Sequence, residues 1–239
     1  MIQAILFDFN GVIIDDEPLQ MSAYEEALRA AGITQTEADY YSGLGMDDNA
    51  FVRAAFERAG MEPTEERMRE VIERKATRHR ELLSDDLPLF PGVVTFVKSL
   101  ARNYPLGLVS MSRRADIDYA LGRAVLDKYF AVIVSAEDVQ AHKPDPACYT
   151  RALELLNEKR DRAAHVLPLR PDECLVIEDS PPGVVAAHTA GMWTLAVTNT
   201  VDEKRLREAR ADVVTGSLAD WSVDALHHVF DIPWERKRQ

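Results

Sequence analysis

The stretch Ile5-Leu6-Phe7-Asp8-Phe9-Asn10-Gly11-Val12 carries the clearest structural signal in this chain. It runs from apolar residues into a carboxylate and then turns at a glycine, as a buried strand does where it ends in a loop. A buried carboxylate is energetically costly unless it serves a purpose, so Asp8 is a candidate active-site residue. Two residues further on, where a second acid would complete a nucleophile and an acid/base pair, the chain has Asn10.

Short apolar runs and helical periods alternate along most of the chain. The runs predict buried parallel strands, and apolar residues at i, i+3, i+4 and i+7, such as those between Val93 and Leu100, predict the helices between them. We therefore expect an α/β fold: a doubly wound, Rossmann-like parallel sheet with right-handed crossovers. The expected strands are 4–8, 106–110, 131–135, 174–179, 193–197 and, more weakly, 212–214.

One stretch interrupts this alternation and shows only helical periods. We expect residues 16–84 to form an all-helical cap domain, inserted into an α/β core domain of residues 1–15 and 85–239. Pro18 on one side and Pro91-Gly92 on the other mark two linkers, which would permit hinge motion. A rigidly packed subdomain is the alternative.

Composition excludes several classes of protein. The 239 residues, 46% of them hydrophobic, suffice for one large domain with an insertion. A formal net charge of −12 opposes nucleic-acid binding, and no apolar run approaches the roughly 18 residues of a membrane span, so we expect neither partner. Cys148 and Cys174 lie in apolar segments and are expected to be free thiols of a cytoplasmic protein. We expect a monomer.

Polar side chains follow the ends of the expected strands. Strand one ends in Asp8, strand two in Ser110 and strand four in Glu178-Asp179, while the loop past strand three carries Lys143. In open α/β sheets the ligand lies outside these carboxyl ends. The set suits phosphoryl transfer, because Lys143 and Ser110 can hold the oxygens over which the transferred group spreads its charge.

The same set predicts a metal ion and a nucleophile. Mg²⁺ prefers one or two carboxylates together with phosphate oxygens and waters, so we expect Asp8 and Asp179 to bind it, with Glu178 as a direct or indirect partner. Backbone N–H groups of the turn from Phe9 to Gly11 can add phosphate donors. Asp8 would form an aspartyl-phosphate, which water or another acceptor resolves.

These segments resemble a known family. In chain order, the four motifs of the haloacid-dehalogenase-like (HAD) superfamily are similar to Asp8-Phe9-Asn10-Gly11-Val12, Ser110, Lys143-Pro144-Asp145 and Glu178-Asp179-Ser180-Pro181-Pro182-Gly183. The helical insertion resembles the cap of the branch that contains beta-phosphoglucomutase-like and phosphoglycolate-phosphatase-like enzymes. The resemblance covers essentially the whole chain.

The resemblance implies a role for each matching residue. Asp8 matches the nucleophile, Ser110 and Lys143 match the phosphate binders, and Asp179 matches the metal ligand. The residue at position 10 supplies a backbone carbonyl to the metal in this family, which Asn10 can still do. We add Met111, beside Ser110, and Gly45, in the cap loop, to the expected phosphate-binding residues.

Asn10 departs from the phosphatases of the family, which carry an aspartate there that protonates the leaving group and then activates water. General acid–base catalysis contributes roughly 10²–10⁴-fold. We therefore expect slow hydrolysis of alkyl phosphates and a smaller loss with acyl or aryl phosphates, which need no proton. Asp15, Asp16 or Glu17 could substitute if the cap closes over the site, although such acids are ordinarily hinge and helix N-terminal charges.

Other chemistries that the resemblance allows fit the residues less well. Dehalogenases of the family dispense with the metal, whereas Glu178-Asp179 is present here. Phosphonate hydrolysis needs a cap lysine that forms an imine, and Lys75, among Arg and Glu residues, is expected on a solvated face.

The mutase branch binds a second phosphate with a cap-loop arginine. At the matching place this chain has Asp47 and Asp48, which would repel a second phosphate. Alternatively, this loop is only a turn with an N-cap. From the two aspartates we infer a substrate with one phosphate and a neutral or cationic remainder.

The sequence thus predicts a Mg²⁺-dependent, phosphatase-like hydrolase that acts on a small phosphorylated metabolite through Asp8 and is slowed by Asn10. Two alternatives remain open. A catalytically weakened member would bind a phosphorylated ligand and signal through cap closure. Asn10 could instead be an introduced substitution that traps a bound ligand.

Overall fold

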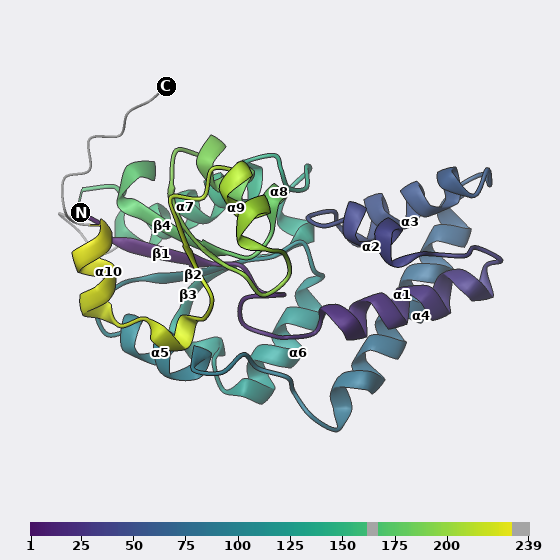
Figure 1. Ribbon diagram of the computed structural model, residues 1–239, viewed down its shortest axis with the longest axis horizontal. Coiled ribbons are helices and arrows are strands. Elements are labelled where there is room, and N and C mark those ends of the chain that lie inside the picture. Colours follow the sequence, from purple (N-terminus) through teal and green to yellow (C-terminus); the bar gives the residue numbers. More distant parts are fainter. Residues whose placement is uncertain (162–166, 231–239) are drawn as a thin grey trace.

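The centre of the molecule is a parallel sheet of six strands in the order β3-β2-β1-β4-β5-β6 (Figure 1). The computed structural model describes residues 1–161 and 167–230. Each expected strand is confirmed, with its ends displaced by at most one residue. The strands are β1 (Ala4–Phe7), β2 (Leu106–Val109), β3 (Phe130–Val134), β4 (Cys174–Glu178), β5 (Trp193–Val197) and β6 (Val213–Thr215).

Strand β1 lies at the middle of the sheet because every one of its side chains is apolar and can be buried. It pairs with β2 on one side and β4 on the other, with Ile5 opposite Leu106 and Leu175. Its side chains alternate between two apolar clusters, Ile5 and Phe7 in one and Ala4 and Leu6 in the other. Two buried faces are typical of a doubly wound sheet.

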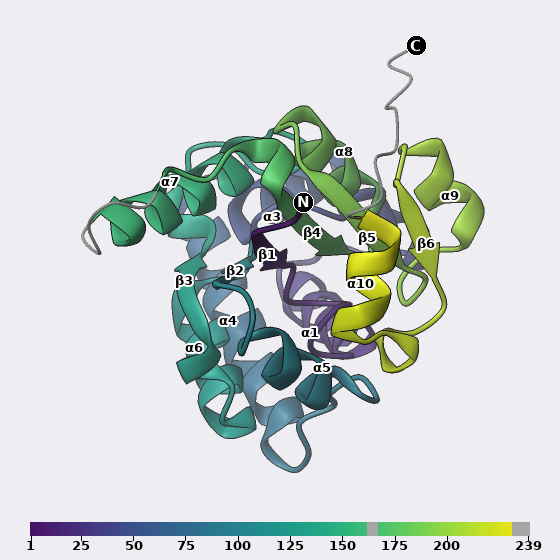
Figure 2. The ribbon, with the colours of Figure 1, turned by 90° about the vertical axis from the view of Figure 1, so that its left-hand side faces the viewer.

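Helices cover both faces of the sheet (Figure 2). One face packs against α5 (Val93–Leu100), α6 (Arg114–Ala124) and α10 (Val223–Phe230). The other packs against α7 (Ala147–Asp161) and α8 (Pro181–Thr189), while α9 (Glu203–Glu208) lies near the β6 edge. The alternation of strand and helix predicted from the apolar periods is therefore present.

A group of helices projects beyond the carboxyl edge of the sheet (Figure 1). It consists of α1 (Glu17–Ala30), α2 (Glu37–Ser42), α3 (Asp48–Arg58) and α4 (Glu65–Ser84). These helices share an apolar cluster of their own, which includes Tyr24, Phe51 and Met68. Residues 16–84 thus contain the expected helices, and we call α1 to α4 the helical cap.

Two expectations from composition can be compared with the structure. Cys148 and Cys174 are both buried and free, as predicted. None of the helices in the described ranges combines the length and apolar character that crossing a membrane requires.

Candidate active site

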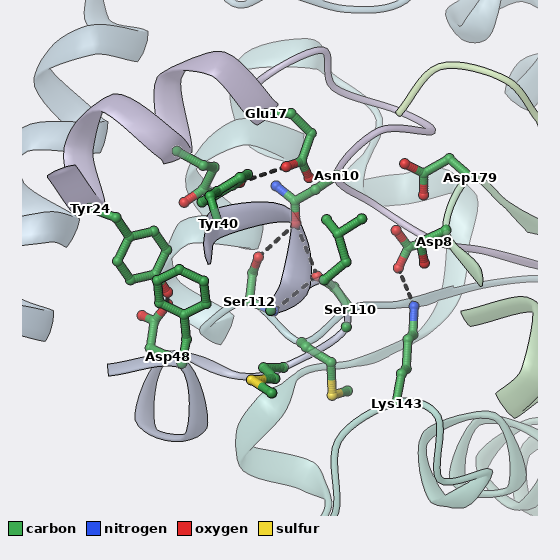
Figure 3. Close-up of a pocket in the computed structure, with 18 of the residues that line it drawn as sticks. Asp8, Asn10, Glu17, Tyr24, Tyr40, Asp48, Ser110, Ser112, Lys143 and Asp179 are labelled. Carbon is green, nitrogen blue, oxygen red and sulfur yellow. Dashed lines mark hydrogen bonds and ion pairs between the residues drawn. The ribbon is translucent and has the colours of Figure 1, made fainter. Parts of the chain in front are cut away.

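The side chains predicted at the strand ends meet around one cavity of about 100 Å³ between the sheet edge and the helical cap (Figure 3). Seven of the predicted site residues line it: Asp8, Asn10, Gly45, Ser110, Met111, Lys143 and Asp179. The other three predicted residues do not line the cavity: Phe9, Gly11 and Glu178. They contact residues that do line it.

Lys143 connects two of the carboxylates. Its Nζ donates to Asp8 Oδ1 at 2.5 Å and to Glu178 Oε1 at 2.6 Å, although the three residues come from distant parts of the chain. Burial would lower the pKa of Lys143, but the charges of Asp8 and Glu178 outweigh it and raise the pKa above its ordinary value. Lys143 is therefore a permanent cation beside Asp8.

Both carboxylate oxygens of Glu178 accept hydrogen bonds from neighbouring protein groups. Besides Lys143, Oε1 accepts from the Tyr149 hydroxyl at 2.8 Å, and Oε2 accepts from the N–H groups of Asp179 and Ser180 at 2.9 and 3.0 Å. Burial raises the pKa of Glu178, but Lys143 and these hydrogen bonds lower it below its usual value. Glu178 is an ionised anchor for Lys143, and its oxygens have little capacity left for a metal.

Asp8 and Asp179 form the part of the cluster that lacks a full set of counter-charges. Burial raises the pKa of Asp8 to about 7 despite the opposing effect of Lys143. Burial and the charge of Glu178 raise the pKa of Asp179 well above its usual value. Carboxylate oxygens of Asp8, Glu178 and Asp179 lie within 4.8 Å of one another. The oxygens of Asp8 and Asp179 are therefore hard donors with uncompensated negative charge, which fit a divalent cation such as Mg²⁺.

The backbone at Gly11 leaves the space that Asp179 fills. Gly11 has a φ of +74°, and a Cβ there would lie 1.9 Å from Asp179 Oδ2. Its N–H donates to the carbonyl of Ile14 at 2.9 Å, so the expected role of this N–H as a phosphate donor is not supported. The Phe9 N–H bonds the Asp8 carboxylate instead.

Asn10 is held by hydrogen bonds on both sides of its amide, and Figure 3 shows those that its Oδ1 accepts. Its Nδ2 donates to both oxygens of Asp16 at 2.9 Å, and its Oδ1 accepts from the hydroxyls of Ser112 at 2.7 Å and Ser110 at 3.4 Å. Asp16, fully buried, lies 2.9 Å from His79 Nε2 on α4, at the distance of an ion pair although the direction does not suit a hydrogen bond. The residue-10 side chain thus joins the core to the cap.

The expectation that Lys75 lies on a solvated face is wrong. Lys75 is 5% exposed and lines the cavity, where its Nζ donates to Asp48 Oδ1 at 3.0 Å and lies 4.5 Å from the centre of the Tyr24 ring. The Arg and Glu residues around it face solvent, but the helical period turns Lys75 inward. Asp47, by contrast, is the N-cap of α3, as one alternative predicted.

Sequence reasoning missed several residues of the cavity wall. Ser112, Tyr40 and Tyr24 line the cavity, and so does Gln20, whose Nε2 donates to Asp16 at 3.2 Å. No local pattern distinguishes these residues from ordinary helix or loop residues. Proximity to the known strand ends was the available signal for Ser112, two residues past Ser110.

Comparison with known proteins agrees with the geometry. Fold and site define the class, a doubly wound α/β protein with an acidic, lysine-containing cavity at the carboxyl edge of its sheet. The haloacid dehalogenase-like hydrolase model matches residues 2–191, and the chain belongs to this family of hydrolases.

Relatives and solved structures resemble the chain over nearly its whole length. A phosphorylated carbohydrates phosphatase of Thermotoga maritima is 32% identical over 215 residues, covering 87% of this chain and 92% of that protein. The beta-phosphoglucomutase of Clostridium difficile has a TM-score of 0.83 at 22% identity, covering 97% of this chain and 98% of that one. A variant of CbbY from Rhodobacter sphaeroides in complex with xylulose-(1,5)bisphosphate has a TM-score of 0.75 at 25% identity, covering 92% and 96%.

Proposed function

We propose that this protein is a Mg²⁺-dependent phosphatase that hydrolyses a phosphate monoester of a small metabolite through an aspartyl-phosphate on Asp8. The observation that carries this proposal is the meeting of Asp8, Ser110, Lys143 and Asp179 around one cavity. A buried carboxylate beside a permanent cation, in a family of hydrolases, supports attack on an anionic phosphate.

Each residue would have a distinct task. Asp8 attacks the phosphorus, and its oxygen forms the new P–O bond as the bond to the leaving oxygen breaks. Lys143 and the Ser110 hydroxyl hold the equatorial phosphate oxygens. Asp8, Asp179 and the backbone carbonyl of Asn10 would hold Mg²⁺, which when bound neutralises charge between the carboxylates and the phosphate.

The cap wall supports a substrate with one phosphate and an uncharged or cationic remainder. The Lys75 ammonium is already paired with Asp48, so it offers less attraction to a second phosphate. Gln20 Oε1 is buried on this wall and has no hydrogen-bond partner in the part of the chain that the structure describes. A hydroxyl or ammonium group of the substrate would satisfy it, which agrees with a phosphorylated carbohydrate or a similar compound.

A test combines turnover with trapping of the covalent intermediate. We expect the protein with Mg²⁺ to release p-nitrophenol from p-nitrophenyl phosphate and to carry a hydroxylamine-sensitive phosphoryl group after quenching with acid. Asp8→Asn should abolish both, whereas Asp15→Asn, a matched change at an exposed carboxylate, should leave both intact.

Removal of the metal gives a second readout. EDTA should abolish turnover and lower the unfolding temperature relative to the Mg²⁺ form, because the cation relieves repulsion between Asp8 and Asp179. Absence of turnover with Mg²⁺, together with a Mg²⁺-dependent affinity for inorganic phosphate, would contradict the proposal and favour the phospho-ligand binder.

A further inference from the structure

Asn10 cannot transfer protons, and the structure shows that its polar atoms are also engaged. Its Nδ2 is bonded to Asp16 and its Oδ1 to Ser112. Hydrolysis of an alkyl phosphate needs a group that gives a proton to the leaving oxygen and takes one from the attacking water. Another side chain must do this if the site is a phosphatase.

Of the three acids that follow the first strand, only one lines the cavity. Asp15 is exposed and is not among the lining residues. Asp16 is fully buried behind Asn10 and does not line the cavity either. Glu17, the first residue of α1, is half-buried and forms part of the cavity wall.

In the described part of the chain, the carboxyl group of Glu17 accepts one side-chain hydrogen bond, which orients it. Its Oε2 accepts from the Tyr40 hydroxyl at 2.5 Å, and Figure 3 shows the group beside Asn10, across the cavity from Lys143. The charge of Asp8 contributes to raising the pKa of Glu17.

The electrostatic surroundings of Glu17 suit both halves of the reaction. Burial and the charge of Asp16 raise the pKa of Glu17 to about 7, while the hydrogen bond from Tyr40 acts in the opposite direction. Near neutral pH, both the acid and the base form are therefore populated. The titratable and charged groups that interact with Glu17 are Asp16, Tyr40, Asp8, Lys75, Asp179 and Tyr41.

We propose that Glu17 is the general acid and base of this site, in the role that the residue-10 side chain cannot fill; this inference rests on the proposed phosphatase function. As Asp8 forms its bond to phosphorus and the P–O bond of the substrate breaks, the Glu17 carboxyl group gives its proton to the leaving alkoxide. The Glu17 carboxylate then takes a proton from the water that attacks the aspartyl-phosphate, which releases phosphate and restores both carboxyl groups.

Glu17→Gln separates the two steps when two substrates are compared. With glycerol 2-phosphate, whose leaving group needs a proton, turnover should fall by about 10²–10⁴-fold. With p-nitrophenyl phosphate, the first step needs no proton but the second still lacks its base. The variant should therefore release a burst of one equivalent of p-nitrophenol and then stall. Asp15→Asn is the matched control, with wild-type rates on both substrates.

Tyr40→Phe tests the same assignment without removing the carboxyl group. In the wild type, kcat/KM for glycerol 2-phosphate should fall as the pH rises through the pKa of Glu17, because the acid form is lost. Loss of the Tyr40 hydrogen bond, which stabilises the carboxylate, should move this fall to higher pH. The profile for p-nitrophenyl phosphate should not show this limb.

The outcomes distinguish the inference from the proposed function. The role of Glu17 would be overturned if Glu17→Gln kept wild-type rates without a burst and Tyr40→Phe kept the wild-type pH profile. These results would leave the proposed phosphatase function intact. A wild-type protein that turns over neither substrate would overturn both. Unfolding temperatures and inorganic phosphate binding report whether each variant retains its folded site.

Discussion

At the scale of single residues, Asn10 and Asp16 form a matched pair. The amide of Asn10 donates to both oxygens of the buried Asp16 carboxylate, which also accepts from Gln20, and Asp16 in turn fixes which way the amide points. A carboxylate at position 10 would face a second carboxylate within hydrogen-bonding distance. The departure of Asn10 from the family pattern is therefore accommodated by a second residue rather than being an isolated loss.

We expect Asn10→Asp to destabilise the protein by on the order of 2–4 kcal/mol at pH 8, because the new carboxylate and the buried carboxylate of Asp16 then lack a donor between them. Combining it with Asp16→Asn should recover most of this loss, since the donor and acceptor are simply exchanged. Urea unfolding of the four proteins in a double-mutant cycle measures the coupling.

The cycle also has an informative negative result. If Asn10→Asp is as stable as the wild type and the two changes are additive, the pair is not matched. Turnover measured in the same variants separates stability from catalysis, because the double variant again carries an acid at position 10.

At the scale of elements, the loop between β1 and α1 determines how closely the carboxylates approach. Gly11 has a positive φ and lies against Asp179, so this turn tolerates no side chain. Gly32, in the loop after α1, offers a control, because it has a φ of +81° and nothing lies within 4 Å of the position of its Cβ.

We expect Gly32→Ala to cost about 1–2 kcal/mol of unfolding free energy from backbone strain alone and to leave the response to Mg²⁺ unchanged. Gly11→Ala should cost more and should also abolish the rise in unfolding temperature with Mg²⁺, because the new methyl group displaces Asp179. Thermal unfolding with and without Mg²⁺ measures both effects. An unchanged Mg²⁺ response in Gly11→Ala would argue against Asp179 as a metal ligand.

At the scale of the whole molecule, the cap lies closed against the core. A Cβ at Gly45 of the cap loop would lie 2.8 Å from Pro182 Cγ. Arg80 of α4 pairs with Asp116 of α6 at 2.9 Å across the same boundary. The cavity of about 100 Å³ is small compared with ligand pockets of roughly 300–1,000 Å³. We therefore expect the cap to open for substrate entry and product release.

Arg80→Ala should weaken the closed arrangement without disturbing the active site. An exposed ion pair contributes about 0.2–1 kcal/mol, so we expect the KM for p-nitrophenyl phosphate to rise by at most about 5-fold while kcat is retained. Added salt should have a similar effect on the wild type and little effect on the variant. Arg74→Ala is the control, because among the described residues Arg74 forms an ion pair only with Glu70 of its own helix, and a rise in KM there would contradict a specific role for Arg80.

Much of the core could be predicted from local sequence. Apolar runs predict strands because both faces of a parallel sheet are buried, and polar residues at the ends of these runs must then gather at one edge. Asp8, Ser110, Lys143 and Asp179 were predicted in this way, and all four line the cavity. The class of fold followed from the same pattern.

The cap side of the site could not be predicted in the same way. Helical residues lie on every side of their helix, so a charged neighbourhood does not tell which side chain turns inward. Lys75 was expected in solvent and is buried against Asp48 and Tyr24. Which of the acids from Asp15 to Glu17 lines the cavity depends on how α1 enters the cap, which is decided by packing.

The order of the elements and the residues at the strand ends could be predicted from the sequence, because both depend on short-range periodicity and on the geometry of parallel strands. The hydrogen bonds between Asn10 and Asp16 and the place of Glu17 in the cavity wall became visible only in the folded protein. These arrangements depend on a cap helix, α4, which brings His79 to Asp16 from 63 positions along the chain. Contacts between such distant residues arise from packing, and no local pattern encodes them.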